Sequence, residues 1–252
     1  MKLPAFFCLW LFLCPPALPQ QTQSFRAEQL TYSRVRTAAK EKDETLRQRF
    51  AERKIPYPPR AILFRAFKKE AQLELWAAGH ANEAFTLIQT YGSCATSGVL
   101  GPKRKFGDEQ VPEGFYELDW FNPQSNFFLS LHISYPNAAD RVLGSHTNAG
   151  GDIFLHGNCV TIGCIPITDE GIKEVYWLAV EVRDLGQRRL PIEIFPARLD
   201  DAGFRALARE HTQQPGLVAF WSNLREGYDL FEQNHRELRV RVTPEGKYLF
   251  SQ

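Results

Sequence analysis

The chain has 252 residues, 44% of them hydrophobic, and a formal net charge of +1. This length fits one globular domain with an extension, and the balanced charge argues against a nucleic-acid partner, which requires a basic patch. Aromatic residues make up 13% of the chain, which favours a β-rich or mixed core over an array of helices.

The first 20 residues are expected to be a secretory signal peptide. Lys2 precedes an apolar run that continues to about Leu18, and a polar stretch follows. The run contains several prolines and is too short for a stable membrane span, which needs roughly 20 apolar residues. Cys14 ends a sequence, LFLC, similar to a lipoprotein box, but Leu13 occupies the position of the usual small residue. Export is therefore the favoured interpretation, with lipidation or a cytosolic protein as the alternatives.

Residues 21–58 are expected to form a helical lead-in to the domain. Lys, Arg and Glu dominate from Ser24 to about Lys54, and the few apolar residues are widely spaced, which predicts a solvated helix. The prolines of PYPPR, residues 56–60, then end the helix and mark the entry to the domain.

Residues 59–196 are expected to form a mainly β domain. Hydrophobic residues alternate with a period of two, and Pro, Gly and Asn occupy the gaps. Strands are predicted around residues 62–67, 72–76, 85–91, 115–121, 127–135, 152–156 and 191–196. A helix capped by Thr168 or Asp169 precedes the last of them. This series predicts a β-sandwich or a barrel-like sheet.

Residues 197–252 are expected to be a C-terminal extension. Helices are predicted over about 201–211 and 216–233, and a hairpin over 237–250. Neither an internal repeat nor a low-complexity linker is evident. The expected fold class is therefore one mainly β domain with helical additions.

The stretch HGNCVTIGC, His156 to Cys164, holds the strongest chemical signal. Without the signal peptide the chain keeps three cysteines, Cys94, Cys159 and Cys164. An oxidising compartment pairs the cysteines that it can, and an odd number leaves one thiol free. Three interpretations of the stretch are open: a nucleophile with its base, a metal site, or one half of a disulfide.

In the nucleophile interpretation, His156 ends an apolar strand and Cys164 follows Gly163 in a turn before a helix. A histidine within hydrogen-bond reach would raise the thiolate fraction of the cysteine by forming a thiolate–imidazolium pair. Gly163 permits a sharp turn that leaves backbone N–H groups for a developing oxyanion, and Thr161 offers a hydroxyl donor at the rim.

The other two interpretations use Cys159. A zinc site would combine His156, Cys159 and Cys164 with His146, although structural zinc ligands usually occur as two close pairs. A Cys159–Cys164 disulfide would close a very small loop, of the kind found in redox switches. A Cys94–Cys159 disulfide would instead leave Cys164 free and account for the odd count, and it is the pairing that we take as the hypothesis.

Several linked motifs resemble the L,D-transpeptidase (YkuD) catalytic domain, in its YafK-like branch. His156-Gly157 matches the first part of the family motif, and Thr161 to Cys164 matches its Ser/Thr-His-Gly-Cys part with Ile162 in place of the histidine. The branch signature continues in SGVLGPK, GDEQVPEGFY, SLHISYPNAADR and GCIPITDEGIKEVY. The resemblance covers roughly residues 60–195.

The resemblance implies a β-sandwich fold, with Cys164 as the acylated nucleophile, His156 as its general base and Gly163 in the catalytic turn. Candidate substrate-binding residues around the cleft are Gly157, Asn158, Thr161, Ile162, His132, Tyr135, Asn137 and His146. The simpler alternatives are a core histidine for His132, turn-forming roles for Tyr135 and Asn137, and a solvated turn for the basic cluster GPKRK.

The resemblance also implies a periplasmic cysteine acyltransferase that acts on peptidoglycan stem peptides containing meso-diaminopimelate, without a metal or an organic cofactor. Typical members carry Arg or Asn just after the cysteine, and this chain has Ile165-Pro166 there, which argues against ordinary cross-linking. The YafK-like branch implies amidase activity that releases a lipoprotein from the wall. Transpeptidation, a non-catalytic wall-binding module and a zinc-dependent peptidase are the alternatives.

Overall fold

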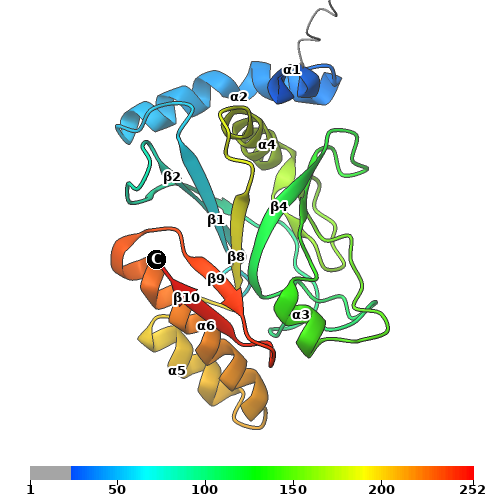
Figure 1. Cartoon of the computed structure of the whole chain (residues 1–252). Helices are drawn as coiled ribbons and strands as arrows, with labels where there is room; N and C mark the ends of the chain where they lie inside the picture. Colours follow the sequence, from blue (N-terminus) through cyan, green and yellow to red (C-terminus); the bar gives the residue numbers. More distant parts are fainter. Residues whose placement is uncertain (1–23) are drawn as a thin grey trace, which may run out of the picture.

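The core of the protein is one mixed sheet of eight strands, curved into a half-barrel (Figure 1). This computed structural model describes residues 24–252, so the expected signal peptide, residues 1–20, lies outside the described residues. The strands are β1 (Ala61–Phe67), β2 (Gln72–Ala78), β3 (Thr86–Gly92), β4 (Gly114–Asn122), β5 (Ser130–Ile133), β6 (Phe154–His156), β7 (Ile165–Pro166) and β8 (Leu190–Phe195). Their order across the sheet is β3-β2-β1-β8-β4-β5-β6-β7. The expected β core with helical additions is confirmed.

Six helices and a hairpin complete the described part of the chain. They are α1 (Phe25–Gln29), α2 (Ser33–Glu52), α3 (Ala138–Leu143), α4 (Thr168–Asp184), α5 (Asp201–Glu210), α6 (Pro215–Asn234) and the hairpin strands β9 (Arg239–Val242) and β10 (Tyr248–Ser251). The sequence did not predict α3 or β7, because elements this short show no hydrophobic period. No helix within residues 24–252 is long and apolar enough to cross a membrane.

Strand β5 is shorter than the strand that was predicted over residues 127–135. Phe128 has a positive φ of 71°, a left-handed conformation that does not fit a strand, so the strand begins only at Ser130. At its other end the peptide bond between Tyr135 and Pro136 is cis, and the chain turns there toward α3.

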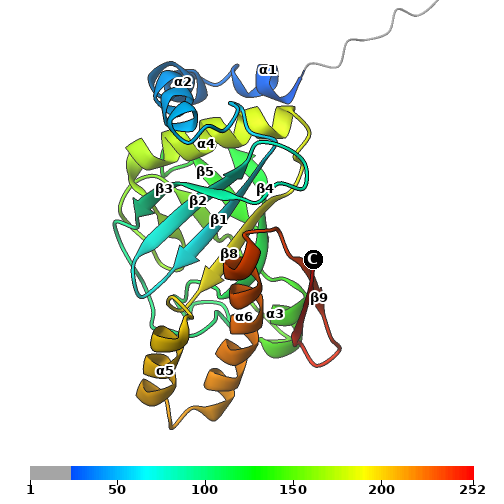
Figure 2. The same cartoon turned by 90° about the vertical axis from the view of Figure 1, so that its left-hand side faces the viewer.

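One side of the sheet, which we call the apolar face, is covered by α4 (Figure 2). Ile62 and Phe64 of β1, Leu131 of β5 and Leu155 of β6 pack in the same hydrophobic cluster as the apolar residues of α4. The predicted stripe of α4 is buried in full, namely Ile172, Val175, Tyr176, Ala179 and Val182. This cluster forms the larger part of the core and fixes α4 directly after the Cys164 segment.

Helix α2 lies across the outer side of α4 (Figures 1 and 2). Its apolar residues Val35, Ala38, Leu46 and Phe50 are fully buried, and their spacing places them on one side of the helix. The expectation of a merely solvated lead-in helix is therefore wrong for this side, because even a sparse apolar stripe is enough to dock a helix on a hydrophobic neighbour.

The other side of the sheet, which we call the mixed face, carries ionisable side chains among apolar ones. Directly paired residues on neighbouring strands point to the same side of a sheet, so Arg65 with Glu193 and Ser130 with His156 mark this face. Helix α6, α5 and the hairpin pack on its half around β1 and β8 (Figure 1). Loops border the other half, at β5, β6 and β7.

A buried ion-pair network joins the sheet to α6 in the covered half. The Arg65 guanidinium is fully buried and donates to the Glu193 carboxylate at 2.9 Å and to the Glu232 carboxylate. It also lies over four aromatic rings, those of Phe67, Phe195, Tyr228 and Phe231. Buried arginines need such partners, because an unpaired charge inside a protein is costly.

Candidate active site

His156 and Cys164 lie on adjacent parallel strands of the mixed face. His156 is the last residue of β6, and Cys164 directly precedes β7. The register pairs Leu155 with Ile165, which places Cys164 beside Phe154, two residues from His156 on the same side of the sheet. The fold therefore brings together the two side chains that the sequence analysis singled out.

The His156 ring is held in one orientation and one tautomer. Its Nδ1 contacts the Gly157 carbonyl oxygen, and because a carbonyl only accepts hydrogen bonds, Nδ1 carries the proton. The ring also stacks on Phe127 with the centroids 4.6 Å apart. Burial lowers the pKa of His156, and the Gly157 hydrogen bond only partly opposes this. Nε2 of a neutral imidazole is therefore the atom that can accept a proton.

Cys164 carries the free thiol of the described cysteines. Its Sγ accepts a hydrogen bond from the Phe154 N–H at 3.4 Å and lies 3.7 Å from the Asp152 carbonyl oxygen. Burial raises the pKa of Cys164, and the negative charge of Asp152 adds to this, while the Phe154 N–H and the Lys103 ammonium oppose it. No hydrogen bond between Cys164 and His156 is present among the described residues.

The lowered pKa of His156 and the raised pKa of Cys164 indicate that both groups are neutral at rest, with a protonated thiol and an unprotonated imidazole. The expected thiolate–imidazolium pair is therefore not the favoured state, because burial disfavours both charges. Proton transfer from the thiol to Nε2 would then accompany attack on a substrate that displaces water and brings the groups together.

Cys94 and Cys159 form a disulfide, with their Cα atoms 5.3 Å apart. The bond ties the segment after β3 to the loop between His156 and Cys164, and the Cys94 N–H also donates to the Pro166 carbonyl at 3.0 Å. Because Cys159 is bonded to Cys94, its sulfur cannot act as a ligand in the zinc site considered above. Residues 24–252 contain no group of three or more His, Cys, Asp or Glu side chains arranged to hold a metal ion.

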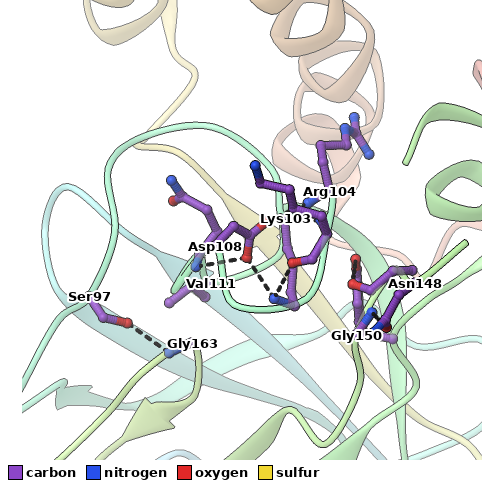
Figure 3. A network of polar contacts seen from close by, with 12 residues as sticks. Ser97, Lys103, Arg104, Asp108, Val111, Asn148, Gly150 and Gly163 are labelled. Carbon is purple, nitrogen blue, oxygen red and sulfur yellow. Dashed lines mark hydrogen bonds and ion pairs between the residues drawn. The ribbon is translucent and has the colours of Figure 1, made fainter. Parts of the chain in front are cut away.

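Gly163 occupies a position that only glycine fits. Its φ is 122°, and an added Cβ would lie 3.1 Å from the Gln110 carbonyl oxygen. Its N–H donates to the Ser97 hydroxyl at 2.8 Å (Figure 3), so the expectation that this amide is free for an oxyanion is wrong. The Cys164 amide, by contrast, donates to no described residue, and it is the backbone donor left for that role.

The loop between β3 and β4 holds a buried lysine close to the cysteine turn (Figure 3). Lys103 is 4% exposed, and its ammonium donates to the Asp108 carboxylate at 2.6 Å and to the Lys105 carbonyl at 3.0 Å. Burial acts to raise the pKa of Asp108, but the bonds from Lys103 and from three backbone N–H groups outweigh it and lower that pKa. The expectation of a solvated turn at GPKRK is wrong for Lys103.

Cys164 lines a pocket of about 430 Å³ between this loop and the ends of β1 and β2. The lining includes Lys68, Lys69, Ser97 and Val111, so it combines cations and a hydroxyl with apolar surface. His156 is not part of the lining. The thiol is therefore reached from this pocket, and the imidazole lies deeper in the sheet.

Three other candidate residues in the loop between His156 and Cys164, namely Gly157, Asn158 and Thr161, are engaged in packing or hydrogen bonds. Gly157 is buried, and an added Cβ would lie 2.5 Å from Asp169 Oδ1, so it is a packing position. The Asn158 amide donates to the same Asp169 carboxylate, and its side-chain oxygen accepts from the Cys159 N–H. The Thr161 hydroxyl donates to the Cys164 carbonyl at 2.8 Å, so the donor expected at the rim is already used within the loop.

Ile162 and the candidate histidines differ in exposure. Ile162 is 79% exposed on the cysteine loop and presents an apolar surface where the family motif has a histidine. His132 is paired in register with Phe154, and its Nδ1 lies 2.7 Å from Asp119 Oδ1. His146 is exposed in the loop between α3 and β6.

Tyr135 and Asn137 serve the fold beside the site. The Tyr135 hydroxyl donates to the Ala149 carbonyl at 3.0 Å, and its ring faces the Lys103 ammonium at 5.9 Å. Asn137 caps α3 and donates to the Phe115 carbonyl and to the Tyr248 hydroxyl, so its side chain is committed to packing rather than to a substrate groove.

Sequence reasoning missed Ser97, Phe127 and Asp169 as parts of the site. Ser97 and Lys103 lie within the quoted signature SGVLGPK, which marked the segment without assigning a role to either residue. Phe127 and Asp169 contact the His156 turn only through the fold, and no local spacing indicates those contacts.

Comparison with known proteins gives strong relatives among curated sequences. No family model matches the chain. The chain is 33% identical over 192 residues, which is 75% of its length and 74% of the relative, to the Escherichia coli K12 protein named "Putative L,D-transpeptidase YafK". Among solved structures, the helical cell shape determining protein Pgp2 of Campylobacter jejuni is 17% identical with a TM-score of 0.41, over 72% of this chain and 73% of Pgp2. An L,D-transpeptidase of Xylanimonas cellulosilytica is 10% identical with a TM-score of 0.34, over 56% and 63%.

Proposed function

This chain belongs to the L,D-transpeptidase family, and on that premise we propose that it is a periplasmic cysteine acyltransferase that works as an amidase on peptidoglycan. Its substrate is a stem peptide with meso-diaminopimelate, and the bond cleaved joins that residue to a wall-linked lipoprotein. The observation that supports the proposal is the free Cys164 thiol at the pocket, beside the strand that ends at His156, whose Nε2 is available.

The first half of the reaction forms a thioester. His156 Nε2 accepts the thiol proton as Cys164 Sγ attacks the carbonyl carbon on the L-centre of meso-diaminopimelate. The Cys164 N–H donates to the oxyanion of the tetrahedral intermediate. The C–N bond then breaks, and the proton held by His156 moves to the departing amine, so that a thioester and a free amine result.

In the second half of the reaction, the group that attacks the thioester determines whether the enzyme is an amidase or a transpeptidase. Water attacks the thioester with His156 again accepting the proton, and the Cys164 thiol is restored as the carboxylate leaves. The buried Ile165 and Pro166 support hydrolysis, because no polar side chain stands where typical members hold an incoming amine. Water needs no such binding site.

The compartment belongs to the same proposal. The apolar N-terminus is the signal for export, and a Cys94–Cys159 disulfide persists in an oxidising periplasm. Residues 59–196 form the catalytic unit in this proposal, and residues 197–252 form its C-terminal extension.

The test is incubation of the purified protein, from residue 21 onward, with intact wall sacculi that carry bound lipoprotein, followed by mass analysis of the fragments. The expected product is lipoprotein released with its terminal amine restored. New cross-links would identify a transpeptidase, and binding without any product would identify a wall-binding module. The matched variant is Cys164→Ala, which is expected to lose product formation completely, and full activity in it would contradict the mechanism.

A further inference from the structure

A second pocket, of about 730 Å³, lies at the end of β1 opposite to Cys164. Arg60 and Ala61 at the start of β1 line it, whereas Ala66 and Phe67 at the other end of this strand line the Cys164 pocket. The loop between β2 and β3, the loop between α4 and β8 and the segment between α6 and β9 also line it. Four parts of the chain therefore meet around this pocket.

Arginines from three of these four parts line the pocket, and we call it the arginine pocket. They are Arg60, Arg188, Arg189, Arg236 and Arg239. The acidic lining residues are Glu83 and Glu237, so five positive and two negative side chains leave a formal charge of +3. The whole chain has a net charge of +1, which means that this one pocket departs strongly from the balance of the molecule.

These arginines lack the ion pairs that other arginines of the protein make. Within the described chain, Arg189 alone of the five has a carboxylate within 4 Å, that of Glu117 at 3.6 Å. The Glu83 carboxylate accepts from the N–H groups of Gly79 and His80 instead. By contrast, Arg49, Arg65, Arg198 and Arg225 each contact a carboxylate at 2.9 Å or less.

Five guanidinium groups and two carboxylates line the pocket, so positive charge is in excess there, and a bound anion would relieve the repulsion among the arginines. Guanidinium groups match phosphate well, since their planar fork donates two parallel hydrogen bonds and stays charged at every relevant pH. One phosphate offers three oxygens to several guanidiniums, whereas a carboxylate offers two. The arrangement therefore favours phosphate over the side chains of an acidic peptide.

The size and floor of the pocket indicate a compact ligand. Its volume falls in the range of small-molecule sites, about 300–1,000 Å³. The lining also includes the buried apolar side chains of Phe85 and Leu238. A ligand that reaches arginines on three separate segments needs more than one anionic group.

We propose that the arginine pocket binds a compact polyanion that carries at least two phosphate groups. The site is separate from the Cys164 pocket and goes beyond the acyltransfer reaction, so it stands whether or not that reaction is the one catalysed. The two-phosphate group can belong to a soluble molecule or to the headgroup of an anionic lipid, and the chemistry of recognition is the same.

The test uses the full chain expressed with its own N-terminus, and inorganic pyrophosphate as the probe in titration calorimetry. The pocket variant is Arg188→Gln/Arg236→Gln. The control is Arg141→Gln/Arg209→Gln, which removes the same charge from exposed arginines outside the pocket. We expect the pocket variant to bind pyrophosphate at least tenfold more weakly than wild type, and the control to stay within about twofold, with affinity that falls as salt is raised. Thermal unfolding of both variants establishes that they are folded.

A second arm separates the sources of the phosphate. Vesicles of phosphatidylcholine with cardiolipin are sedimented with each protein, and binding that the pocket variant loses identifies a lipid headgroup, while pyrophosphate binding alone identifies a soluble ligand. Equal pyrophosphate affinity in wild type and pocket variant, or no binding at all, would overturn the proposal. Tighter binding of poly-glutamate than of pyrophosphate would overturn the assignment to phosphate.

Discussion

The mixed face of the sheet has two halves that treat buried ionisable groups in opposite ways. In the half covered by α6, the Arg65 guanidinium has two carboxylate partners and four aromatic neighbours. In the half bordered by loops, His156 and Cys164 have no charged partner in hydrogen-bond contact, and burial keeps both groups neutral. Burial is common to both halves, so the partners decide whether a group stabilises the fold or stays available for reaction.

The coverings of the two halves explain this difference. A helix brings side chains that remain in place, and Glu232 on α6 completes the Arg65 network. A loop pocket leaves space beside the thiol for a substrate. The comparison predicts that replacing the paired Arg65 alters stability and leaves the reaction rate unchanged, while replacing His156 or Cys164 alters the rate and leaves stability nearly unchanged.

The largest expected effect is on activity, in the open half. His156→Gln removes the group that accepts the thiol proton, and the rate of lipoprotein release should fall by about 10²–10⁴-fold, the usual contribution of a general base. Urea unfolding should change little. His211→Gln is the matched control, because His211 also directs Nδ1 to a backbone carbonyl, that of Leu207, but lies at the C-terminal end of α5. A His156→Gln enzyme with more than half of its activity would remove His156 from the mechanism.

The next effect is on stability, in the covered half. Arg65→Met leaves the Glu193 carboxylate buried without its cation, and the free energy of unfolding should fall by about 3–5 kcal/mol. Urea denaturation measures the loss, and the rate at a temperature where the variant is folded should match wild type. Arg47→Met, which removes the pair between an exposed arginine and the half-buried Asp43, should cost less than about 1 kcal/mol. Equal losses in the two variants would contradict the role assigned to burial.

The disulfide joins two loop segments beside Cys164. Its removal should lower the free energy of unfolding by as much as Arg65→Met or by less. Cys94 and Cys159 are 65 residues apart, so Cys94→Ser/Cys159→Ser should lower the free energy of unfolding by about 2–4 kcal/mol. Urea unfolding of wild type with and without reductant gives the same comparison. The double variant should not respond to reductant. A wild type that is equally insensitive would mean that the bond is absent in solution.

The smallest expected effect is on the titration of Cys164, measured as the pH dependence of its alkylation by iodoacetamide. Burial raises the pKa of this thiol, so the reaction should reach half of its maximal rate above the pH typical of an exposed thiol. Lys103→Met should raise the midpoint further, and Asp152→Asn should lower it, with several-fold opposite changes in rate near pH 8. Shifts of the same sign in both variants would contradict this electrostatic account.

The same shifts set the pH range over which the open half stabilises the fold. Folding lowers the pKa of His156 from 6.5, so its contribution is present above that pH and is lost as the pH falls through the folded value. Folding raises the pKa of Cys164 from 9.0, so its contribution is present below that pH and is lost as the pH rises. Both contributions are therefore complete only between about pH 6.5 and 9.0.

Hydrophobic period and turn chemistry predicted the strands and helices that are long enough to repeat a pattern. Strands β1 and β2 and helices α4 to α6 appear close to the predicted bounds, and the stripe of α4 from Ile172 to Val182 is buried as expected. The order of strands across the sheet could not be predicted, because pairs such as Arg65 with Glu193 join residues 128 positions apart.

For the site, the sequence located His156 and Cys164 but not the state of the groups around them. That Gly163 donates to Ser97 and Thr161 to the Cys164 carbonyl depends on where the loops fold back, which residue identity does not determine. Lys103 was misjudged for a related reason. A lysine in a run of basic residues is usually solvated, but Asp108 and the surrounding backbone carbonyl hold this one inside the loop.

Strand β1 spans the distance between the arginine pocket and the Cys164 pocket. Arg60 and Ala61 line the arginine pocket, and Ala66 and Phe67, six residues on, line the Cys164 pocket. At about 3.3 Å per residue the strand separates them by roughly 20 Å. Strand β1 is hydrogen bonded to β2 on one side and to β8 on the other, which holds this separation fixed. Under the two proposals above, a ligand that occupied both sites would carry its phosphate groups about one strand length away from the bond that Cys164 attacks.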